Sequence, residues 1–158
     1  MALLQPYPQR RPYYPTKAKH EENLQLQVCQ YLRLQYPHII FRSDFASGLH
    51  MTMHQAAIHK SLQSGRAWVD LFIYKPSRSY AGLGLELKKE GTAIYVSKGP
   101  NKGELVADPH VREQAMLIEE LNRLGYLARF GVGFDNCKRI IDWYLRPGYT
   151  EPTNEELF

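Results

Sequence analysis

The segments WVDLFIY at residues 68–74 and GLGLELK at residues 82–88 decide the fold of this 158-residue chain. Alternation in the first segment predicts a strand with Val69, Leu71 and Ile73 on one face and Asp70 on the other. The second segment repeats the pattern, with three leucines on one face and Glu86 and Lys88 on the opposite face. Turn-forming residues separate the two segments, including Pro76 and Ser77. An antiparallel hairpin is therefore predicted, and it brings Asp70 beside Glu86 and Lys88.

The segments around this hairpin predict an alternation of helices and strands. Helices are expected at 21–35, 52–64, 109–124 and 135–145, and further strands at 38–42 and 126–132. The helix at 109–124 begins with Asp108 as N-cap and Pro109 at its first position. Its predicted buried stripe is Val111, Ala115 and Ile118, supported by Leu117, Leu121 and Leu124. Residues 91–107 predict a loop or protruding hairpin, long enough to favour a functional flap.

Composition limits the class of protein. The length fits one compact domain, and no apolar run approaches the roughly 20 residues that span a bilayer.

The net charge of +4 is concentrated in segment 1–19, which has four basic residues and no acidic residue. This Pro-rich arm can contact a polyanion, although a solvated tail explains the charge equally well. We expect a basic arm at 1–19, a folded domain at 20–148, an acidic tail at 149–158 and an intracellular location. Two distant cysteines, Cys29 and Cys137, predict reduced core thiols.

Two carboxylates and one ammonium on the polar side of an apolar hairpin have two explanations. The simpler one is a solvated face, which is ordinary in antiparallel sheets. The other is phosphodiester hydrolysis, because carboxylate oxygens suit Mg²⁺ or Mn²⁺ and a neighbouring lysine can offset charge on a phosphate. The E-x-K pair of Glu86 and Lys88 is by itself a weak signal.

The order of the motifs is more specific. A helix, a strand, a strand with Asp, a strand with E-x-K, a helix and a strand resemble the core of the PD-(D/E)XK nuclease superfamily. Within it, SGRAWVDLFI, LGLELKKEGT and VREQAMLIEELNRLGY resemble the virus-type replication-repair nuclease (VRR-NUC) family over about residues 21–145. The resemblance implies an α/β fold with a mixed sheet: a restriction-endonuclease-like αβββαβ core with an extra helix between the first two strands and a C-terminal helix. One departure is Val69, where the family usually has proline.

The resemblance also implies roles for individual residues. Asp70 and Glu86 would bind Mg²⁺ or Mn²⁺ together with the backbone carbonyl of Leu87, and Lys88 would be the catalytic lysine. Gln114 would match the family's helical glutamine, facing the active site or the DNA backbone; otherwise it faces solvent. Glu22 would match a helix carboxylate that contacts the metal, but its neighbour Glu21 fits as well, and a first-turn glutamate favoured by the helix dipole is the alternative.

Basic residues beside these motifs are candidates for phosphate contact. They are Arg42, Lys60, Arg66, Lys89, Lys98 and Lys102. The spacing of His54 and His59 does not fit a metal-ligand pair. The function implied is a metal-dependent DNA endonuclease that acts on branched or four-way DNA and forms a homodimer. The alternative is a nucleic-acid-binding module with a nuclease fold and no turnover.

Overall fold

The computed structural model describes residues 20–44, 52–64 and 68–153, with side chains from residue 24 onward. Its elements run in the order α, β, α, β, β, α, β, α along the chain. The helices are α1 (His20–Gln35), α2 (Met53–Ser61), α3 (Pro109–Arg123) and α4 (Gly133–Leu145). The strands are β1 (Phe41–Ser43), β2 (Leu71–Ile73), β3 (Leu83–Lys88) and β4 (Leu127–Val132).

The four strands form one mixed sheet in the order β1-β2-β3-β4. β1 and β2 are antiparallel, β2 and β3 form the expected hairpin with Leu71 opposite Leu85, and β3 and β4 are parallel. The parallel pair is connected through α3, as parallel neighbours require a crossover. The predicted αβββαβ core, with an extra helix after the first strand and a C-terminal helix, is confirmed.

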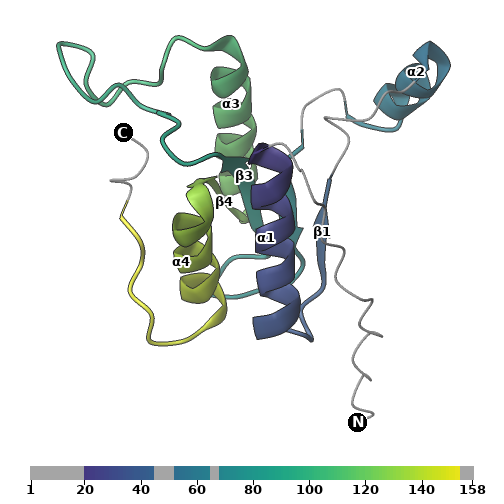
Figure 1. Ribbon diagram of the computed structural model, residues 1–158, viewed down its shortest axis with the longest axis vertical. Helices are drawn as coiled ribbons and strands as arrows, with labels where there is room; N and C mark the ends of the chain where they lie inside the picture. Colours follow the sequence, from purple (N-terminus) through teal and green to yellow (C-terminus); the bar gives the residue numbers. More distant parts are fainter. Residues whose placement is uncertain (1–19, 45–51, 65–67, 154–158) are drawn as a thin grey trace.

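Helices cover both faces of the sheet (Figure 1). On one face, α1 and α4 pack on leucines of β2 and β3, and this cluster contains both free cysteines. On the other face, α3 packs on Val69, Phe72 and Ala128 and, further along, on Phe130 and Val132. The solvated-face interpretation of the hairpin is therefore wrong, because Glu86 lies in a covered layer and is only 4% exposed.

Two local predictions are also wrong. Val69 packs with Phe72 on the α3 side and not with Leu71 and Ile73, because the chain bends at Asp70 and the strand alternation stops there. Leu124, expected in the buried stripe of the third helix, is 63% exposed since it lies at the C-cap, beyond the last helical turn that faces the sheet. The start of that helix agrees with prediction, as the Asp108 side chain accepts a hydrogen bond from the backbone N–H of His110 at 2.8 Å.

Two segments project from the body of the domain (Figure 1). The first is the predicted hairpin at 91–107, anchored by buried Ile94 and closed by a bridge between Tyr95 and Leu105. The second is α2, which begins with a capping box between Thr52 and Gln55 and has no buried residue in the part of the chain described. In Figure 1 both segments lie toward the upper end of the molecule, where α3 also lies.

The ends of the chain are only partly described. The basic arm at 1–19 lies outside the described residues, so its role stays a prediction. Near the other end, Glu151 forms an ion pair with Arg129 of β4 at 3.1 Å, so the acidic tail contacts the domain at its first glutamate. No helix within the described ranges is long and apolar enough to cross a membrane.

Candidate active site

Asp70 and Glu86 meet beside the start of β2: Asp70 directly precedes that strand, and Glu86 lies within β3. Since Leu71 pairs with Leu85, a regular hairpin would place residue 69 opposite Leu87. Instead, the backbone N–H of Leu87 donates to Oδ2 of Asp70 at 2.8 Å. The carboxylate thus replaces a backbone acceptor of the ladder, and its side chain is held beside Glu86.

The backbone of Asp70 is fixed as firmly as its side chain. Its carbonyl oxygen accepts hydrogen bonds from the Ser43 hydroxyl at 2.9 Å and from the backbone N–H of Asp44 at 3.0 Å. Gln25 of α1 spans the same junction, with its amide nitrogen 2.7 Å from Ser43 Oγ and 2.6 Å from the Asp44 carbonyl. Gln25 and Ser43 therefore position Asp70, and sequence reasoning missed both because neither belongs to an apolar stripe or a motif.

The electrostatics of the site are dominated by excess negative charge. The pKa of Glu86 is raised from 4.5 to about 8, first by burial and then by the charge of Asp70. Lys88 opposes this rise, with its ammonium 3.4 Å from Oε1 of Glu86 and its side chain 14% exposed. One ammonium does not balance two carboxylates in a covered site, so a further positive charge would be favoured there.

Gln114 closes the site from α3. It is 5% exposed, and its amide nitrogen donates to Oε1 of Glu86 and lies 3.0 Å from the Nε2 of His110. The solvent-facing alternative for this residue is therefore wrong. Its amide oxygen is buried and has no hydrogen-bond partner among the described residues. His110, one helical turn before Gln114, was not predicted, although the i, i+4 spacing of two polar residues was a visible signal.

The structure brings together Asp70, Glu86, Lys88 and Gln114, but not all the other candidates. The side chain of Glu22 and the whole of Arg66 lie outside the described residues. Five predicted phosphate contacts are exposed but spread over β1, α2, the end of β3 and the projecting hairpin: Arg42, Lys60, Lys89, Lys98 and Lys102. They stay predictions.

The donor set fits a hard divalent cation in part. Carboxylate oxygens are the ligands that Mg²⁺ and Mn²⁺ prefer, and the unpartnered Gln114 oxygen can accept a hydrogen from water bound to such an ion. However, no group of three or more His, Cys, Asp or Glu side chains is placed to hold a metal within residues 24–44, 52–64 and 68–153. The two carboxylates would thus need neutral oxygen ligands or water to complete the coordination.

The fold and this carboxylate pair indicate an α/β domain of the nuclease type. Among solved structures, the chain is similar to one described as "VRR_NUC domain protein", with 25% identity and a TM-score of 0.52. The match covers 82% of this chain and 90% of the other. No family model matches the chain, and no curated protein does. The resemblance to VRR-NUC domains that the motif order indicates is confirmed by this structural similarity.

Proposed function

We propose that this protein is a metal-dependent nuclease that hydrolyses DNA phosphodiester bonds at Asp70, Glu86 and Lys88. The observation that carries the proposal is the covered carboxylate pair: burial and, after it, the charge of Asp70 raise the pKa of Glu86 to about 8. Carboxyl groups whose pKa is strongly raised by burial and by a neighbouring charge are typical of functional sites. The similarity to a VRR_NUC domain protein supports the same conclusion and favours DNA as the substrate, which agrees with the intracellular location predicted from the sequence.

The carboxylates of Asp70 and Glu86 would hold Mg²⁺ or Mn²⁺, together with the backbone carbonyl of Leu87. When bound, such an ion lowers the pKa of coordinated water and offsets charge on a phosphate oxygen. The protein itself supplies rigidity, because the hydrogen bonds to both the carbonyl and the carboxylate of Asp70 fix that residue before substrate arrives. A preformed arrangement of this kind avoids reorganisation during the reaction.

Lys88 of β3 and Gln114 of α3 complete the reaction centre, since both contact Oε1 of Glu86. The Lys88 ammonium, close to Glu86 but not fully buried, can move toward a phosphate and stabilise the charge that develops on it. The Gln114 oxygen can accept a hydrogen from the attacking water and so orient that water for attack. In this proposal Lys88 contacts the substrate, whereas Gln114 orients the nucleophile.

Cleavage assays test the proposal directly. Linear, flapped and four-way DNA are incubated with Mg²⁺, Mn²⁺ or EDTA, and cutting of a circular substrate without free ends distinguishes endonucleolytic cleavage. We expect cutting that requires the metal and that falls at least about 100-fold in Asp70→Asn and Lys88→Ala, as for loss of one preorganised charge-stabilising group. Lys75→Ala is the matched control, because this exposed lysine lies beyond the other end of β2. Cutting that survives in Lys88→Ala would contradict the assignment of the site.

A second candidate function is nucleic-acid binding without turnover. It is favoured by one observation: among the described residues no third acidic side chain joins Asp70 and Glu86, so metal binding at this site would depend on water and on phosphates of the substrate. The same assays separate the two functions. Wild-type protein that binds DNA in gel shifts but cuts none of the substrates with either metal would establish the second function and exclude the first.

The proposed preference for branched DNA and the proposed homodimer both rest on the resemblance to VRR-NUC domains. Comparison of linear, flapped and four-way substrates tests the first, and sedimentation tests the second.

A further inference from the structure

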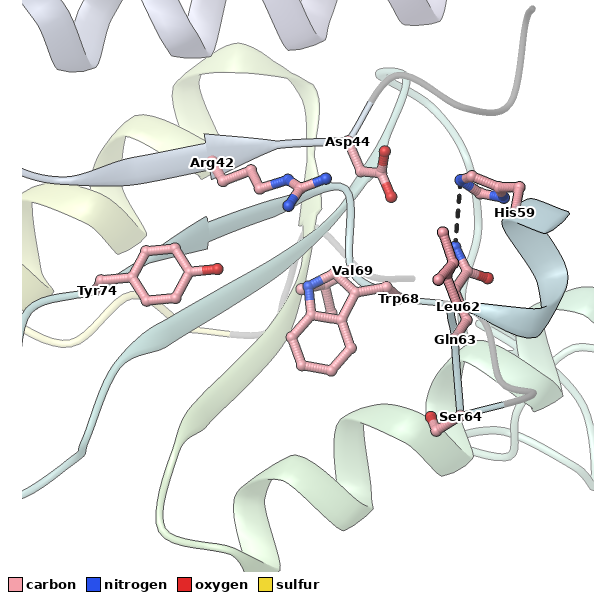
Figure 2. Close-up of a pocket in the computed structure, with 9 residues that line it drawn as sticks. All are labelled: Arg42, Asp44, His59, Leu62, Gln63, Ser64, Trp68, Val69 and Tyr74. Atoms are coloured by element: carbon pink, nitrogen blue, oxygen red, sulfur yellow. Dashed lines mark hydrogen bonds between the residues drawn. The ribbon is translucent and has the colours of Figure 1, made fainter. Parts of the chain in front are cut away.

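A cleft is lined by Val69, the residue before Asp70, on the side of the sheet that α3 covers. Figure 2 draws the residues that line it. The cleft has a volume of about 520 Å³ and lies between α2, the edge strand β1 and the segment that leads into β2. Val69, which precedes Asp70, is in its wall, and so is Asp44, whose backbone N–H donates to the Asp70 carbonyl at 3.0 Å. The cleft and the carboxylates therefore share one stretch of backbone.

Two exposed aromatic rings line this cleft. Trp68 is 47% exposed and Tyr74 is 51% exposed, although large aromatic side chains are usually well covered. Both are supported from behind by buried Phe72, with ring centroids 5.8 Å from Trp68 and 4.8 Å from Tyr74. The rings are thus held by the core while part of their surface faces the cleft.

A cation and an imidazole ring lie beside these aromatic rings. Arg42 is opposite Phe72 in the strand register, so it projects on the same face of the sheet, and Figure 2 shows its guanidinium between Tyr74 and Asp44. His59 of α2 lies across the cleft. Aromatic surfaces next to a cation are the combination that binds single-stranded nucleic acid, where bases stack on rings and phosphates contact the charge.

We propose that this cleft binds an unpaired nucleobase, stacked on Trp68 and Tyr74, with an adjacent phosphate at Arg42. A base within a duplex is already stacked on both neighbours, so only an unpaired or extruded base can enter. The volume is in the range of small-molecule pockets, which suits one nucleotide rather than a helix. The proposal rests on the proposed function for its choice of ligand, and it deepens that function by naming a strand with an unpaired base beside the scissile phosphate as the substrate.

Tryptophan fluorescence tests the proposal without any cleavage. The chain has two tryptophans, and Trp143 is 7% exposed, so quenching by an added oligonucleotide reports on Trp68. The protein is titrated in EDTA with short oligothymidylate, with an abasic strand of equal length and with a duplex. We expect quenching and tighter binding with the base-bearing single strand only. Equal affinity for the abasic strand would overturn the proposal, because phosphates alone would then account for binding.

Variants separate stacking from folding. Trp68→Ala and Tyr74→Ala should each weaken binding of the single strand at least about fivefold, whereas Trp68→Phe should retain most of the affinity. Tyr149→Ala is the matched control, since Tyr149 is 46% exposed and lies outside the cleft. Circular dichroism establishes which variants fold, and if Trp68→Ala does not fold, Tyr74→Ala decides. Unchanged affinity in a folded Trp68→Ala or Tyr74→Ala variant would overturn the proposal, and so would a loss of affinity in folded Trp68→Phe as large as that expected for Trp68→Ala.

The two proposals fail in distinguishable ways. Base-dependent binding in EDTA without cutting in Mg²⁺ would contradict the nuclease function and leave the cleft as a nucleobase site. Cutting in Mg²⁺ without base-dependent binding would support the nuclease function and contradict the nucleobase site. A third outcome is that a second copy of the chain fills the cleft. In that case Trp68→Ala would convert a dimer to a monomer in sedimentation without changing the affinity for the oligonucleotide, and the proposal would be overturned.

Discussion

The charge of Glu86 makes a prediction that stability measurements can test. In the metal-free protein, burial and the charge of Asp70 raise the Glu86 pKa from 4.5 to about 8. Between these pH values the folded chain keeps a proton that the unfolded chain loses. Because the folded state then binds more protons, the free energy of unfolding falls as pH rises through this window, and this group adds no further change outside it.

Replacing Glu86 by Gln removes this dependence. One pKa unit corresponds to about 1.4 kcal/mol, so the shift is equivalent to roughly 5 kcal/mol across the window. Glutamine keeps the size of the side chain and an oxygen that can accept the hydrogen bond from Gln114. We expect the free energy of unfolding of Glu86→Gln to equal that of wild type at pH 4.5 and to exceed it by about 3 to 5 kcal/mol at pH 8.

The assay is urea unfolding followed by circular dichroism in EDTA, in half-unit steps from pH 4.5 to 8. Glu119→Gln is the control, because it makes the same chemical change at an exposed position of α3. The reasoning would be refuted if the free energies of unfolding of Glu86→Gln and wild type differed by the same amount at every pH from 4.5 to 8. Such a constant difference would place the Glu86 pKa at its ordinary value. The same variant should lose cleavage, so stability and activity should change in opposite directions.

Three further predictions concern other parts of the chain. Tyr31 and Tyr36 donate to Asp142, and although burial alone would raise the Asp142 pKa, these hydrogen bonds and Lys138 lower it. Tyr31→Phe should therefore reduce the free energy of unfolding by about 1.5 to 3 kcal/mol at neutral pH and by less as pH falls below about 4; a loss independent of pH in urea titrations would contradict this. A Cβ at Gly131 would lie 2.6 Å from Sγ of Cys137, so Gly131→Ala should destabilise by about 1 to 3 kcal/mol. Cys137→Ala in that background should recover part of the stability, and simple additivity in a double-mutant cycle would argue against the clash. Deleting residues 1–19 should weaken DNA binding and reduce the salt slope by about 0.9 for each phosphate that the arm neutralises; an unchanged slope would show that the arm does not bind DNA.

The order of the elements and the hairpin could be predicted because they depend on local periodicity. The alternation around Leu71 and Leu85 determined which residues face α1 and α4, and Asp108-Pro109 marked the start of α3. What could not be predicted is what covers the second face of the sheet. Alternation does not distinguish a solvated layer from one that a helix covers, and the position of α3 over Glu86 depends on interactions between residues distant in sequence.

The supporting residues of the site were invisible for the same reason. Gln25 reaches the Asp70 carbonyl across 45 positions and Ser43 across 27, so no local pattern relates them. Gln114 was identified only through resemblance, since a glutamine in a helix is most often at the surface. The basic residues of the exposed segments gave the weakest predictions, because exposure alone does not say what a charge binds.

The failure of alternation at Asp70 is itself informative about the site. Three hydrogen bonds to the Asp70 carbonyl hold the backbone at the end of the β1–β2 ladder, and the chain bends there. As a result, Val69 turns toward α3 and the Asp70 carboxylate takes the ladder position opposite Leu87. A regular strand would have satisfied the Leu87 N–H with backbone and placed no carboxylate there. Departures from local rules are expected where function requires a geometry that regular structure does not supply. Asp70 is such a position, which independently supports the proposal that the reaction centre lies at this bend.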